Sequence, residues 1–61
     1  MNDVEYYTRL ASEMSELRLM LHKQLNEAVK AKQEKRVAYI ENTIEFLGKM
    51  IDAANEEIHD A

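Results

Sequence analysis

The sequence predicts an all-α protein: a two-helix antiparallel hairpin, which we expect to dimerise into a four-helix bundle. Apolar residues recur at helical spacing through both halves of the chain. The 61 residues include no proline and a single glycine, so few residues would interrupt a helix. The apolar pattern changes phase near the middle of the chain, which indicates two helices within one domain, residues 1–61.

The first helix is predicted from about residue 3 to about residue 30. Asn2, followed three residues later by Glu5, is typical of an N-cap with a capping-box partner. From there, apolar side chains recur three and four residues apart, with Gln24 as the one polar member of the series. The predicted seam consists of Tyr7, Leu10, Met14, Leu17, Leu21 and Ala28.

The second helix is predicted from about residue 34 to about residue 58. Its seam is unbroken and repeats at three and four residues, the spacing with which one helix packs against another. The members of this seam are Val37, Ile40, Ile44, Leu47, Ile51, Ala54 and Ile58. Gly48 lies inside this helix and indicates either a close approach by another group or a tolerated weak point.

The two seams are out of phase, which favours a reversal of the chain at about residues 31–34. Val37 is nine positions after Ala28, and at about 100° per residue this turns the second seam roughly half a turn from the first. In a hairpin the two seams face each other. Residues 31–36 contain no Gly, Pro, Asn, Asp or Ser, so one long coiled-coil helix remains the alternative.

Each predicted helix is apolar over more than one stripe. On the second helix Tyr39, Phe46 and Met50 follow a line beside the seam, and the first helix adds Leu19 and Met20. A hairpin of this size does not cover both lines by itself. We therefore expect these five residues to form the interface with a second copy, making a homodimer, or with an unidentified protein partner.

Charge is distributed unevenly along the chain, whose net charge is −4. A basic cluster, here called the basic tip, would lie at the reversal and consists of Lys30, Lys32, Lys35 and Arg36. Such a cluster is either a solubilising loop or a contact for RNA or an acidic partner. It lacks the interleaved aromatic residues expected for single-stranded nucleic acid, and the overall charge is acidic, so we expect no general nucleic-acid binding.

The sequence contains no catalytic, metal-binding or cofactor-binding signature. Glu56 and His59 have the three-residue spacing of a di-iron carboxylate motif, but the seams around them are apolar. The chain has no cysteine, and no apolar run approaches the roughly 20 residues of a membrane span. We expect a cytoplasmic protein that is not an enzyme and that requires no membrane, metal or cofactor.

The expected architecture resembles two groups of small helical hairpins, although no diagnostic motif carries the resemblance. These groups are the Rop-type plasmid RNA-binding dimers and the small co-chaperones of type III secretion needle subunits. The leading prediction is a protein–protein interaction module, a small helical regulator, inhibitor or adaptor that acts as a homo-oligomer. The alternatives are an obligate heteromer subunit or co-chaperone that docks through Tyr39, Phe46 and Met50, and RNA binding through the basic tip.

Overall fold

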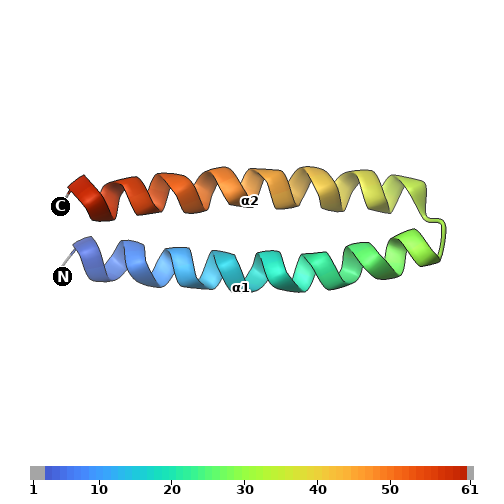
Figure 1. Ribbon diagram of the computed structural model, residues 1–61, viewed down its shortest axis with the longest axis horizontal. Helices are drawn as coiled ribbons and strands as arrows, with labels where there is room; N and C mark the ends of the chain where they lie inside the picture. Colours follow the sequence, from blue (N-terminus) through green and yellow to red (C-terminus); the bar gives the residue numbers. More distant parts are fainter. Residues whose placement is uncertain (1–2, 61) are drawn as a thin grey trace.

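Two long antiparallel helices joined by a short turn make up the structure (Figure 1). The computed structural model describes residues 3–60, so the predicted N-cap at Asn2 lies outside the described residues. Helix α1 spans Asp3–Lys30 and helix α2 spans Glu34–Asp60, two residues beyond the predicted end. The hairpin is 44 Å long and 14 Å by 13 Å across. The predicted helical hairpin is confirmed, and the single-helix alternative is wrong.

The reversal is a helix C-cap built without glycine. The Lys32 amide donates to the Val29 carbonyl at 3.1 Å, and the Gln33 amide donates to the Ala28 carbonyl at 3.0 Å. This pair of hydrogen bonds is the Schellman motif, in which the residue that follows the C-cap adopts the left-handed conformation. Lys32 occupies that position with φ of 57°. A β-carbon in this region is strained, which is why glycine is the usual residue.

Helix α2 begins directly after this cap. The Val37 amide donates to the Gln33 carbonyl at 2.9 Å, so Gln33 is the N-cap residue. The Gln33 side chain accepts a hydrogen bond from Arg36 Nη1 at 3.2 Å. Glutamine is not among the preferred N-cap residues. Both halves of the turn therefore use residues that are unfavourable for their positions, and helix packing must compensate.

The α2 seam faces α1 as the sequence predicts. Ile40, Leu47, Ile51 and Ala54 are buried, and Val37, Ile44 and Ile58 are half-buried at the remaining positions. Residues spaced alternately three and four apart lie on the same side of a helix, and the pattern repeats every seven residues. The 3–4 repeat of residues 37–58 thus determines which side of α2 packs.

The α1 seam differs from the predicted one at Leu17 and Gln24. Tyr7, Leu10, Met14, Leu21 and Ala28 are buried or half-buried as expected, but Leu17 is 44% exposed and Gln24 is exposed. The series that alternates with Tyr7, Met14, Leu21 and Ala28 on the side facing α2 consists of Val4, Ala11, Arg18 and Leu25, all buried or half-buried. The predicted and the observed seam both have 3–4 spacing and share every second member, so periodicity alone does not choose between them.

Antiparallel heptads place the two seams in level layers. Met14, Ala11, Leu47, Ile51 and Ala54 form one buried cluster, against which Tyr7, Leu10 and Leu21 pack. Following both repeats from this cluster sets Ala11 level with Ala54, and Met14 level with Ile51. Arg18 is the polar member of the seam and is level with Leu47.

Replacing Lys32 with glycine should stabilise the hairpin by about 1 kcal/mol, because glycine adopts the left-handed conformation without strain. Thermal unfolding followed by circular dichroism at one protein concentration measures the change. The matched control is Lys30→Gly, which removes the same charge from the last residue of α1 and should destabilise by about 0.5–1 kcal/mol. Equal effects of the two substitutions would contradict the strain at position 32.

Candidate protein-interaction face

The second apolar line of α2 is exposed along its length. Tyr39 is 71% exposed, Phe46 is 64% exposed, and Met50 is 40% exposed. Thr43 lies in the same line, and its hydroxyl donates to the Tyr39 carbonyl at 2.8 Å. The bond satisfies the hydroxyl within the helix, so it would not be left unpaired under an apolar partner. The line therefore has the composition of a surface that can be buried.

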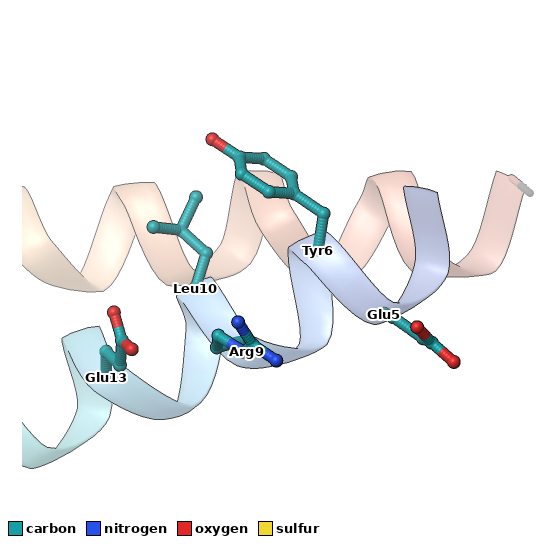
Figure 2. Close-up of a pocket in the computed structure, with 5 residues that line it drawn as sticks. All are labelled: Glu5, Tyr6, Arg9, Leu10 and Glu13. Atoms are coloured by element: carbon teal, nitrogen blue, oxygen red, sulfur yellow. The ribbon is translucent and has the colours of Figure 1, made fainter. Parts of the chain in front are cut away.

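Helix α1 carries a matching line. Tyr6, Leu10, Leu17 and Met20 repeat at four, seven and three residues, which places them on one side of the helix. Figure 2 shows Tyr6 and Leu10 projecting in the same direction from successive turns of α1. Tyr6, Leu17 and Met20 are exposed, while Leu10 is half-buried against the core. Two members of this line, Leu10 and Leu17, had been predicted to lie in the α1 seam.

The hairpin brings the two lines together on one face. Near the turn, Gln24 and Glu27 of α1 line the same groove as Arg36 of α2. Gln24 lies seven residues after Leu17, and Arg36 lies three residues before Tyr39, so the groove continues both lines. We define the apolar face as Tyr6, Leu10, Leu17, Met20, Tyr39, Phe46 and Met50.

The opposite side of the hairpin is predominantly polar. There, Val29 of α1 and Glu41 of α2 line one shallow hollow beside the turn. Positions seven and fourteen residues along from these two include His22, Ser15 and Asn55. Of the five residues predicted to form the interface, Tyr39, Phe46, Met50 and Met20 lie on the apolar face.

Leu19, the fifth predicted interface residue, is 62% exposed but does not join the other four. It lies seven residues before Asn26 and seven after Ser12, on the polar side of α1. Tyr6 also belongs to the apolar face, although it is not among the five residues predicted to form the interface. Its signal was present, because Tyr6 and Leu10 lie in the same 4–3 frame that ends at Met20.

Gly48 lies beside the seam, next to the one charged seam residue. A β-carbon built on Gly48 would lie 3.7 Å from Nη1 of Arg18, an ordinary van der Waals contact. Arg18 is half-buried, and its guanidinium reaches the α2 backbone at Gly48. Within the hairpin, the absence of a side chain at position 48 is therefore not required by close packing.

The basic tip surrounds the turn. Lys30 ends α1, Lys32 lies in the turn, and Lys35 and Arg36 lie in the first turn of α2, all of them exposed. Glu34 lies between these cations. The cluster thus forms one end of the molecule, opposite the end at which both helices reach the termini (Figure 1).

Residues 3–60 form no enclosed site for a ligand. The hollow in Figure 2 has a volume of about 340 Å³ and is lined by Glu5, Tyr6, Arg9, Leu10 and Glu13. All five belong to α1, so the hollow is a depression on one helix surface. Across the same described range, no group of three His, Asp or Glu side chains is placed to hold a metal ion. Neither α1 nor α2 has an apolar stretch long enough to cross a bilayer.

Comparison of the chain with protein-family models, curated proteins and solved structures gives no match. The most distinctive feature of the hairpin is the apolar face, which carries six exposed large side chains from two helices, together with the half-buried Leu10.

Gly48→Ala should stabilise the hairpin by about 1 kcal/mol, because alanine has the higher helix propensity and the new methyl group meets only ordinary contacts. Chemical denaturation at fixed protein concentration measures the change. The control is Asn42→Ala on the exposed outer side of α2, where the gain from propensity is smaller. A loss of stability at Gly48→Ala would show that another chain approaches the bare backbone there.

Proposed function

We propose that this chain is a protein–protein interaction module, a small helical regulator or adaptor that works as a homo-oligomer through the apolar face. One observation carries the proposal: exposed Tyr, Phe, Leu and Met side chains from both helices lie on the same face. Aromatic residues and Met are enriched in the buried centres of protein interfaces. In this proposal the module acts by binding and catalyses no reaction.

The surface area of the hairpin supports a partner of substantial size. Its accessible surface is 5050 Å² for a chain of 7.1 kDa. A compact monomer of that mass exposes about 4,100 Å². The excess is roughly 1,000 Å², close to the roughly 800 Å² that each partner contributes to a standard stable interface.

The dimensions of the apolar face give a similar estimate of the area available for an interface. The hairpin is 44 Å long. Two helices with their side chains are about 20 Å wide, so one side presents roughly 900 Å². The interior, by contrast, is small: the seven buried side chains among residues 3–60 include three alanines, and no large side chain is fully buried. Association would supply the apolar burial that the isolated hairpin lacks.

The alternative uses the same face for a different protein. An obligate heteromer would dock Tyr39, Phe46 and Met50 on its partner and would leave the isolated chain monomeric or aggregated. The state of the isolated chain in solution therefore separates the two proposals.

Light scattering coupled to size exclusion should give a dimer for the wild type. Phe46→Glu should weaken self-association by at least about 100-fold, because a symmetric interface loses the aromatic contact twice and buries two charges. The matched control is Asn42→Glu, which adds the same charge to the exposed outer side of α2 and should leave the dimer intact. Circular dichroism checks that each variant is helical.

A monodisperse, stably folded wild-type monomer would contradict self-association through the apolar face. Equal weakening by Phe46→Glu and Asn42→Glu would also contradict it, since general charge repulsion would then explain the effect. Dimer formation that persists in Phe46→Glu would place the contact on another surface.

A further inference from the structure

The two ends of the hairpin carry opposite charge. The open half, residues 3–16 and 48–60, contains eight acidic and two basic side chains, a net charge of −6. The tip half, residues 17–47, contains four acidic and six basic side chains, a net charge of +2. Figure 1 shows why the division is spatial: both termini lie at one end and the turn lies at the other.

Two symmetric arrangements can cover the apolar face with a second copy. In the tip-to-tip arrangement the turns lie at the same end, and α1 of each copy covers α2 of the other. In the tip-to-open-end arrangement the copies run in opposite directions, α1 covers α1, and α2 covers α2. Both are two-fold symmetric and use the same patch on each copy.

Building on the proposed function, we infer that the occupant of the apolar face is a second copy of this chain in the tip-to-open-end arrangement. The distribution of charge favours this arrangement. This arrangement sets each half of net charge +2 beside a half of net charge −6. The tip-to-tip arrangement instead sets the two acidic halves beside each other, and like-charge juxtaposition selects strongly against a binding geometry.

The exposed line of α2 is complementary to the same line on a second copy that runs in the opposite direction. Read along the helix, the line is Arg36, Tyr39, Thr43, Phe46, Met50, Ala53 and Glu57. Reversed on a second copy about Phe46, it places the Arg36 cation level with the Glu57 carboxylate. It also places the large Tyr39 level with the small Ala53. Each such match occurs twice in the dimer because of the two-fold symmetry.

The same register pairs apolar residues at the centre of α1. The seam layers make Phe46 of α2 level with the segment between Leu17 and Met20 of α1. Reversal about that level sets Leu17 of one copy beside Met20 of the other. The apolar residues at the centre of the face would therefore meet one another on both helices, with charged groups at the rim, as in a typical interface.

A distance measurement between two labels tests the orientation. The chain contains no cysteine, so Arg36→Cys gives one labelling site per copy for a nitroxide probe. In the tip-to-open-end dimer the two sites are separated along the bundle by 21 residues of helix, about 31 Å. In the tip-to-tip dimer they lie at the same level, under about 20 Å apart. A distance of roughly 30 Å or more is expected, and the shorter distance would overturn the inference.

Disulfide formation provides an independent readout. In Arg36→Cys/Glu57→Cys the two sites within one helix are about 31 Å apart, far beyond the roughly 7 Å between Cα atoms that a disulfide spans. Oxidation should therefore convert the double variant to a covalent dimer. The single variants Arg36→Cys and Glu57→Cys serve as controls and should not crosslink, because like sites lie at opposite ends.

The outcomes separate this inference from the proposed function. A dimer with the short label distance, or with crosslinks in the single variants equal to those in the double variant, retains self-association but overturns the orientation. A wild-type monomer overturns both. The double substitution leaves the open half acidic and the tip half basic, so the charge argument applies to the tested protein as well.

Discussion

Two packed helices bury one stripe from each helix, and this constraint governs the rest of the molecule. Each helix of this chain carries two apolar stripes, so formation of the hairpin covers only half of them. The covered half makes a thin core, in which Ala28 is the most completely buried side chain at 1% exposure. The uncovered half makes the apolar face. The covered stripes thus form the fold, and the proposed function rests on the uncovered ones.

Packing of the core depends on the sizes of its side chains as well as on their hydrophobicity. Alanine lies at both ends of the seam, at Ala28 beside the turn and at Ala11 and Ala54 in the open half. Small side chains allow two helices to approach closely, and larger ones such as Met14 and Ile51 fill the level between. The turn then reverses the chain within three residues, at the cost of a left-handed lysine.

The surfaces of the hairpin divide the remaining roles. The apolar face offers the area and residue types of a protein interface, whereas the opposite side is polar and the outer sides are charged. Charge also runs along the molecule, from an acidic open half to a basic tip. In the proposed dimer the apolar face would supply affinity, and the charge polarity would select one orientation over another.

Sequence periodicity predicted much of the fold but left one ambiguity. The α2 seam, the positions of the two helices and the reversal near residue 31 all followed from apolar spacing. The α1 seam did not, because series containing Leu17 or Arg18 both alternate at three and four residues and share Met14 and Leu21. Periodicity favoured the more apolar series, whereas packing buries the one that contains Ala11.

The sequence by itself determined the helices and the existence of surplus apolar residues, since both depend on local spacing along one chain. Only the tertiary structure decided that the two exposed lines share a face. The shared face depends on antiparallel packing, which brings Gln24, Glu27 and Arg36 to one groove near the turn. The exposed lines that contain Leu17 and Phe46 extend from this groove along the two helices. The same reversal separates Leu19 from the other apolar residues and collects the charges at opposite ends. These are relations between helices, which no periodicity within a single helix records.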